Sequence, residues 1–153
     1  MNLVFEGING SGKTTIIEGV RNELDSRQIP YHYISDLVYQ TPLTPVLKKM
    51  LEGDVFLELN EQFETSLYES LILAANHHYI QEKMRNVSSV KLFDRDYISV
   101  LAYQKEFIQK GYENWESFYQ AFREIMLFEL KSIDLLVYVS VPFLENVKRT
   151  EKR

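Results

Sequence analysis

The stretch Gly7-Ile8-Asn9-Gly10-Ser11-Gly12-Lys13-Thr14 fits the pattern G-x-x-x-x-G-K-[S/T] and holds three of the 6 glycines in the 153-residue chain. A short apolar strand pattern over 3–5 precedes it, and a helical pattern over 12–27 follows it. Glycines at such a turn let backbone N–H groups point inward, and the positive end of the next helix favours anions. The stretch therefore predicts a loop that wraps a polyphosphate.

The residue types that end this loop suit phosphate transfer from ATP. We expect Lys13 to reach the β- and γ-phosphates and Thr14 to offer its hydroxyl to Mg²⁺. The residues predicted to contact the ATP phosphates are Gly7, Asn9, Gly10, Ser11, Gly12, Lys13, Thr14 and Thr15. A glycine-rich turn with an incidental lysine is the alternative, and the strand-to-helix context disfavours it.

Composition narrows the class of protein. A chain of 153 residues with 45% hydrophobic and 25% charged residues is typical of one globular domain. Cysteine is absent, which excludes disulfides and thiolate zinc sites and suits a reducing cytosol. The net charge of -5 and a pI near 5.3 argue against a nucleic-acid partner. No apolar run reaches membrane-spanning length, so we expect a cytoplasmic protein without a membrane partner.

Strand and helix patterns alternate along the chain. Strands are predicted over 3–5, 31–35, 90–93 and 135–141, the last being the strongest pattern, and helices over 12–27, 46–51, 61–85, 98–109, 115–130 and from Pro142 onward. Short apolar strands without polar alternation predict an α/β fold, a parallel sheet with helices on both faces. Ligands of such sheets bind beyond the carboxyl ends of the strands.

A charged pair, Asp94-Arg95, directly follows the third predicted strand, at this ligand-binding edge. An aspartate there can hold a Mg²⁺-bound water, and an arginine can clamp a phosphate in two-point geometry. Taken alone, the pair also fits a surface ion pair of little energetic value. Together with the glycine loop it predicts a catalytic set of Lys13, Asp94 and Arg95, with Thr14 and Asp94 as metal ligands.

With both motifs in view, the chain resembles the thymidylate kinase family. FEGINGSGKTT over 5–15 is similar to the family loop F-E-G-x-D-G-x-G-K-T-T, and DRDYISVLAYQ over 94–104 is similar to D-R-[Y/H]-x-x-S-x-x-A-Y-Q. The resemblance, which extends over the order of elements from 1 to 153, implies a P-loop NTPase-type kinase. Such a kinase uses ATP and Mg²⁺ to phosphorylate dTMP or a related nucleoside monophosphate. The resemblance also implies that Arg95 binds the acceptor phosphate, that Ser99 and Gln104 lie near the base, and it permits a homodimer.

Several family positions hold other residues here. Asn9 replaces an aspartate of the loop, and D-L-V-Y-Q-T-P over 36–42 replaces R-E-P-G-G-T-P. Leu73 stands where the family has a phenylalanine that stacks on thymine, and His77 where it has an arginine that contacts the base. The residues that the resemblance implies for the acceptor are Asn9, Asp36, Lys48, Leu73, His77, Arg95, Ser99 and Gln104. The differences predict a relaxed or altered selectivity for thymine.

For two of these residues, a role without ligand contact stays open. His77 fits a buried, hydrogen-bonded helix residue as well as it fits a base contact. Lys48 fits solvated surface better than a phosphate contact. At the other family motif, Asp96 occupies the position of the usual tyrosine or histidine, and Tyr97 is displaced by one residue.

Two other functions remain open at this point. A deoxynucleoside kinase shares the architecture and the loop but needs a carboxylate base for a sugar hydroxyl, and Asp36 stands where such a base would be useful. The sequence ends at Arg153, before the arginine-bearing lid and the last elements of the family. We therefore expect 1–153 to be a single kinase domain that lacks its C-terminal part near the lid. That ending motivates the second alternative, a nucleotide-binding protein without useful catalysis.

Overall fold

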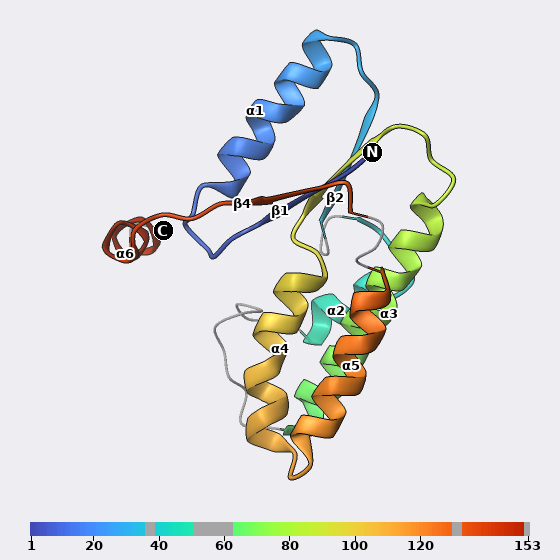
Figure 1. Ribbon diagram of the computed structural model, residues 1–153, viewed down its shortest axis with the longest axis vertical. Coiled ribbons are helices and arrows are strands. Elements are labelled where there is room, and N and C mark those ends of the chain that lie inside the picture. Colours follow the sequence, from blue (N-terminus) through green and yellow to red (C-terminus); the bar gives the residue numbers. More distant parts are fainter. Residues whose placement is uncertain (36–38, 51–62, 130–132, 152–153) are drawn as a thin grey trace. The chain divides into compact units, whose positions relative to one another are not determined.

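The computed structural model describes residues 1–35, 39–50, 63–129 and 133–151. The chain divides into two compact units, which are described separately. The first unit consists of Met1–Ser35, Ser88–Asp96 and Ile133–Arg153, and the second of Asp36–Val87 and Tyr97–Ser132. Figure 1 labels the helices and strands of both units.

The first unit contains a four-stranded parallel sheet (Figure 1). Its elements are β1 (Asn2–Glu6), α1 (Lys13–Ser26), β2 (Tyr31–Ser35), β3 (Val90–Asp94), β4 (Leu135–Tyr138) and α6 (Phe143–Thr150). The strand order is β2-β3-β1-β4, and Leu3 of β1 lies opposite both Leu92 and Leu135. The predicted α/β class with a parallel sheet is confirmed.

Helix α1 is fixed on this sheet by a small apolar core. Ile17, Val20 and Leu24 recur at spacings of three and four residues, so they lie on one face of the helix. They pack with Phe5 of β1 and Leu92 of β3, which are both buried. The glycine loop is consequently held between two packed elements, strand β1 and helix α1.

Strand β4 differs from its prediction. It ends at Tyr138, whereas the sequence pattern predicted a strand over 135–141, and Leu135, Leu136 and Tyr138 are exposed. Among the described residues β4 pairs with β1 alone, so it lies at the edge of the sheet. The chain makes one more bond to β1, from Val139 N–H to the Glu6 carbonyl at 2.7 Å. Pro142 has no N–H to extend the ladder, and α6 begins at the next residue.

The second unit contains four helices among its described residues: α2 (Thr44–Met50), α3 (Phe63–Met84), α4 (Tyr97–Gly111) and α5 (Trp115–Glu129). The four helices were predicted, and α4 extends beyond its predicted range of 98–109 to begin at Tyr97 and end at Gly111. Residues 51, 61–62 and 130, at the edges of the predicted ranges, lie outside the described part. Among the described helices, none combines the length and the apolar character that crossing a membrane requires.

The start of α2 is set by a threonine. The hydroxyl oxygen of Thr41 accepts hydrogen bonds from the backbone N–H groups of Leu43 and Thr44, each at 3.1 Å. A side-chain oxygen that satisfies the first N–H groups of a helix favours its formation. The same hydroxyl donates to Asn76 Oδ1 on α3 at 2.5 Å, which joins α2 to α3.

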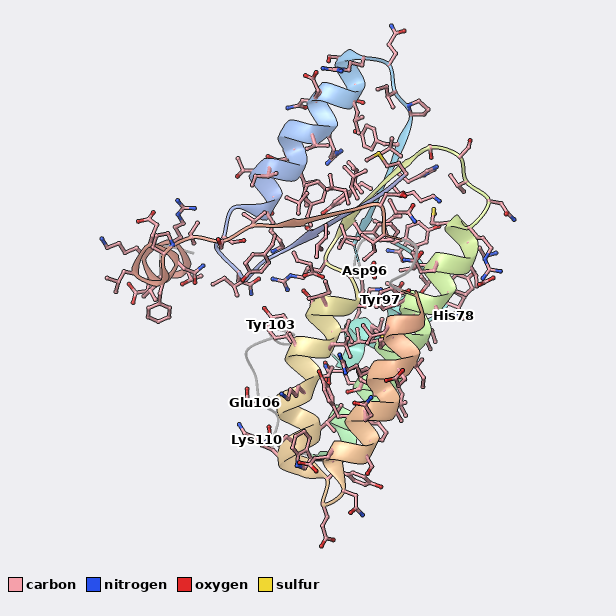
Figure 2. The ribbon with its side chains drawn as sticks, viewed as in Figure 1. His78, Asp96, Tyr97, Tyr103, Glu106 and Lys110 are labelled. Carbon is pink, nitrogen blue, oxygen red and sulfur yellow. The ribbon has the colours of Figure 1, made fainter. Side chains whose placement is uncertain are left out.

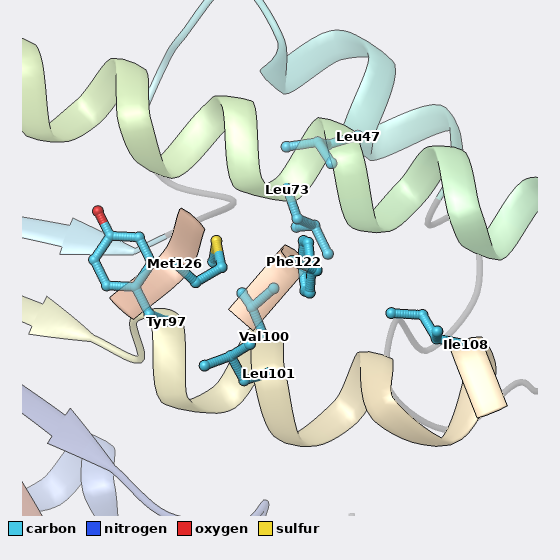
Figure 3. Close-up of a cluster of buried hydrophobic side chains, with 8 residues drawn as sticks. All are labelled: Leu47, Leu73, Tyr97, Val100, Leu101, Ile108, Phe122 and Met126. Carbon is cyan, nitrogen blue, oxygen red and sulfur yellow. The ribbon is translucent and has the colours of Figure 1, made fainter. Parts of the chain in front are cut away.

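An apolar cluster forms the core of the second unit (Figure 3). Its buried members are Leu47, Leu73, Tyr97, Val100, Leu101, Ile108, Phe122 and Met126. The α4 members recur at helical spacing, which gives that helix one buried face. Each fully buried side chain of this size contributes about 1.5–3 kcal/mol, so this cluster holds the helices together.

Candidate active site

The glycine loop of the first unit has a geometry that most residues cannot adopt. Gly7 has a φ of 152°, and a Cβ added there would overlap the carbonyl oxygen of Val139. Gly12 precedes the first residue of α1 with a φ of 96°. The close approach of the backbone to Val139, just after β4, therefore explains why position 7 holds a glycine.

Gly7→Ala is expected to destabilise the fold by about 1–3 kcal/mol, because the new methyl group meets a backbone oxygen that cannot swing away. Chemical denaturation of both proteins measures the change. Gly19→Ala is the matched control: nothing lies within 4 Å of its added Cβ, and alanine favours a helix by up to about 1 kcal/mol. Equal destabilisation by both substitutions would show that the close approach at Gly7 has no energetic weight.

The N-terminal end of α1 has the character of an anion site. No side chain of the described residues caps it, and its first turn holds no acidic residue. The first N–H groups of a helix need an external acceptor, and the helix dipole makes that acceptor an anion. Lys13 is the first residue of the helix and is largely buried. Ser11 Oγ is also buried, without a hydrogen-bond partner among the described residues.

Asp94 ends β3 beside this loop, and a tyrosine holds its carboxylate. Tyr33, on the neighbouring strand β2, donates its hydroxyl to Asp94 Oδ2 at 3.0 Å. Burial, followed by the charge of Asp94, raises the pKa of Tyr33 to about 12, so the hydroxyl stays protonated at neutral pH. The guanidinium of Arg21 lies 5.3 Å from the centroid of the Tyr33 ring. One oxygen of Asp94 is thus held in place.

Arg95 adopts a left-handed backbone conformation with a φ of 70°, which is rare for a residue with a side chain. Its N–H donates to the Phe5 carbonyl at 2.9 Å, which fixes the turn to β1. The side chain donates from Nη2 to Asn9 Oδ1 at 2.5 Å. The structure therefore brings together three of the predicted site residues, Asn9, Asp94 and Arg95, at the carboxyl ends of β1 and β3.

Asp96 and Tyr97, labelled in Figure 2, are both buried. The backbone N–H of Asp96 donates to the buried carboxylate of Glu6 at 3.0 Å. Within the second unit, the Tyr97 ring lies 5.0 Å from the ring of His77. The sequence prediction did not assign a role to Glu6, although it belongs to the matched loop motif.

Most of the residues predicted for the acceptor lie in the second unit, and most of those that the structure describes are buried. Leu73 is 5% exposed and belongs to the apolar cluster, while His77 and Ser99 are also buried. Lys48 is exposed. Asp36 lies outside the described residues. A side chain that fills a core has little surface left for a ligand, so the base contact of Leu73 stays a prediction.

Gln104 belongs to a polar network between α3 and α4. Its Oε1 accepts from Ser70 Oγ at 2.6 Å, and its Nε2 donates to Glu69 Oε1 at 3.2 Å. The sequence pattern did not single out Ser70 or Glu69. A signal was available for Ser70, because it precedes Leu73 and His77 by three and seven residues and so lies on the same helix face. Along α4, Tyr103 lies on the side that carries the exposed Glu106–Lys110 ion pair (Figure 2).

Burial raises the pKa of the Glu69 carboxyl, although the hydrogen bond from Gln104 lowers it. A raised pKa gives a stability contribution that is present at low pH and is lost as the pH rises through the raised value. Glu69→Gln is therefore expected to gain stability over the wild type as the pH rises from about 4 to about 7. The gain stays below about 1 kcal/mol, because water screens a half-buried carboxylate.

Urea denaturation at both pH values measures this gain, with Glu113→Gln as the control because Glu113 is exposed. A wild type that gains stability over Glu69→Gln with rising pH would contradict the argument, and so would a difference that does not depend on pH.

Together, the fold and the loop define a class of protein. A parallel sheet whose first strand leads through a glycine-rich loop into a helix that begins with lysine is the architecture of P-loop nucleotide-binding proteins. Residues 5–153 match the family model described as thymidylate kinase. The chain belongs to the thymidylate kinase family.

Two curated relatives are described as members of the same family. A protein of Methanobrevibacter smithii described as a probable thymidylate kinase is 30% identical over 105 residues, which cover 69% of this chain and 52% of that protein. The thymidylate kinase of Leptospira borgpetersenii serovar Hardjo-bovis is 35% identical over 104 residues, with coverages of 67% and 48%. The aligned part thus spans about half the length of these relatives.

A solved structure has a similar fold. The deoxyadenosine kinase from M. mycoides with bound dATP superimposes with a TM-score of 0.62, at 16% sequence identity. The match covers 100% of this chain and 72% of that one. At this level of identity the likeness concerns the fold alone.

Proposed function

We propose that this protein is an ATP-dependent nucleoside monophosphate kinase that transfers the γ-phosphate of ATP to dTMP or a related nucleotide. The observation that carries the proposal is the contact between Arg95 and Asn9, which holds a guanidinium against the glycine loop. The loop would bind the donor polyphosphate, and Arg95 would bind the acceptor phosphate beside it. The family membership and the names of both curated relatives support this choice.

The chemistry of this transfer asks for alignment more than for proton removal. The oxygen of the acceptor monophosphate is already anionic, so no strong base is needed. Lys13 and Arg95 would neutralise the charge that repels the two phosphates and hold them in line. Water exclusion around the largely buried Lys13 strengthens its attraction for the phosphates.

The residues at the loop fit a magnesium ion bound with ATP. Mg²⁺ prefers oxygen ligands from one or two side chains together with phosphates. Thr14 is exposed in the first turn of α1, and Tyr33 donates to Oδ2, one of the two carboxylate oxygens of Asp94. Thr14 and Asp94 would hold the ion, which neutralises phosphate charge when bound.

A thermal-shift screen tests the proposal, because a ligand that binds the folded state raises its midpoint of unfolding. We expect ATP and dTMP to raise the midpoint and thymidine to leave it unchanged. Because Leu73 and His77 replace the phenylalanine and the arginine that the family uses for thymine, we also expect other pyrimidine monophosphates to raise the midpoint of unfolding. A shift with nucleosides but not with monophosphates would favour the deoxynucleoside kinase, and no shift with any nucleotide would refute both.

Three further properties stay predictions: a single kinase domain over 1–153, a homodimer, and a cytoplasmic location. Size-exclusion chromatography with light scattering measures the oligomeric state directly.

A further inference from the structure

Helix α6 packs in an unusual way, with apolar side chains outward and a polar one inward. Phe143 and Leu144 are 75% and 74% exposed, whereas Asn146 is only 8% exposed. Asparagine is mostly found on protein surfaces, and a buried one normally serves a specific hydrogen bond. The contact of Asn146 is therefore a specific feature of how this helix meets the glycine loop.

The buried carboxamide of Asn146 lies on the glycine loop. Its Nδ2 donates to the backbone carbonyl of Asn9 at 2.5 Å. A Cβ added at Gly10 would lie 2.9 Å from this nitrogen and 3.0 Å from Thr150 Cγ2, so Gly10 leaves room for the contact. Thr150 also donates its hydroxyl to the Asn146 carbonyl at 3.1 Å.

Asn9 is consequently held at two ends. Its side-chain oxygen accepts from Arg95, and its backbone oxygen accepts from Asn146. The peptide that joins Asn9 to Gly10 is trans and planar, so the Gly10 N–H points opposite to the Asn9 carbonyl. Holding that carbonyl toward α6 turns the Gly10 N–H away from α6.

We propose that Asn146 is a positioning residue for the glycine loop: by binding the Asn9 carbonyl it orients the Gly10 N–H toward a phosphate oxygen of the bound nucleotide. This inference rests on the proposed function, since it assumes that the loop binds a nucleotide polyphosphate. Without the carboxamide, the Asn9 carbonyl loses this restraint, and the bound nucleotide loses a preorganised donor at the Gly10 N–H.

The test compares wild type with Asn146→Ala and with Asn146→Leu, which keeps the branched shape of the side chain but not the donor. Asn22 is exposed on α1, so Asn22→Ala and Asn22→Leu are the matched controls. Calorimetric titration with Mg·ATP should give about tenfold weaker binding for both Asn146 variants, the loss expected for one hydrogen bond. The Asn22 variants should bind as the wild type does.

A second readout separates positioning from general stability. The ¹⁵N–¹H resonance of Gly10 should shift on saturation of the wild type with ATP, and this shift should be lost or much reduced in the Asn146 variants. A variant that is merely less stable would keep the Gly10 shift in its folded fraction.

Unchanged affinity and an unchanged Gly10 shift in either folded Asn146 variant would overturn the inference and leave the proposed function intact. A wild type that binds no ATP would overturn the proposed function, and the inference with it.

Discussion

Lys13→Ala should abolish measurable phosphate transfer and weaken ATP binding. Lys13 is the first residue of α1 and is largely buried. In the proposed function its charge would meet the phosphates that bind at this end of the helix. Removing one preorganised charge or donor from such a site lowers the rate about 100- to 1,000-fold. A coupled assay of ADP formation measures the rate, and calorimetry measures the affinity for ATP.

Lys110→Ala is the matched control for Lys13→Ala, because Lys110 is exposed and forms a surface ion pair with Glu106 that contributes little. Its rate should equal that of the wild type. Wild-type activity in the Lys13 variant would mean that the glycine loop is not the phosphate site.

Arg95→Ala should raise the KM for the monophosphate acceptor by about 10- to 100-fold, the loss of one or two charge-assisted hydrogen bonds. The KM for ATP should change far less. Alanine also carries a Cβ, so the left-handed backbone at this position stays as strained as before. The kinetic effect therefore reports the lost guanidinium rather than a relaxed turn.

Arg27→Ala, which removes an exposed arginine paired with Glu23 in the same unit, should leave both KM values unchanged. Equal losses for ATP and for the acceptor in the Arg95 variant would count against an acceptor role. An effect confined to nucleoside acceptors would instead favour a deoxynucleoside kinase.

The sequence was sufficient to predict the parts of this molecule that local patterns encode. The loop motif, the helices and the parallel class of sheet follow from spacing and composition, and the structure agrees with them. The end of β4 was predicted wrongly, because a run of apolar residues does not reveal that its strand lies at an edge of the sheet. Pro142 was the one local signal that the ladder stops before α6.

The contacts that shape the candidate site were beyond sequence reasoning. Tyr33 meets Asp94 only because β2 and β3 are neighbours in the sheet, although 61 residues separate the two side chains. Asn146 contacts Asn9, which lies 137 residues earlier in the chain. The pattern of α6 alone would predict that Phe143 and Leu144 are buried, whereas the structure buries Asn146 and exposes both apolar residues. Such contacts depend on tertiary packing, which cannot be predicted from the local patterns of a single sequence.

Transfer of labelled phosphate in a single turnover tests whether this protein phosphorylates a nucleoside monophosphate. The protein is mixed in excess with γ-labelled ATP and Mg²⁺, together with either dTMP or thymidine, and the products are separated. An excess of protein over ATP makes even slow transfer visible. We expect label in dTDP when dTMP is present, no label on thymidine, and transfer by Lys13→Ala that is slower by about 100- to 1,000-fold. Label on thymidine, or none on dTMP with the wild type, would contradict this expectation.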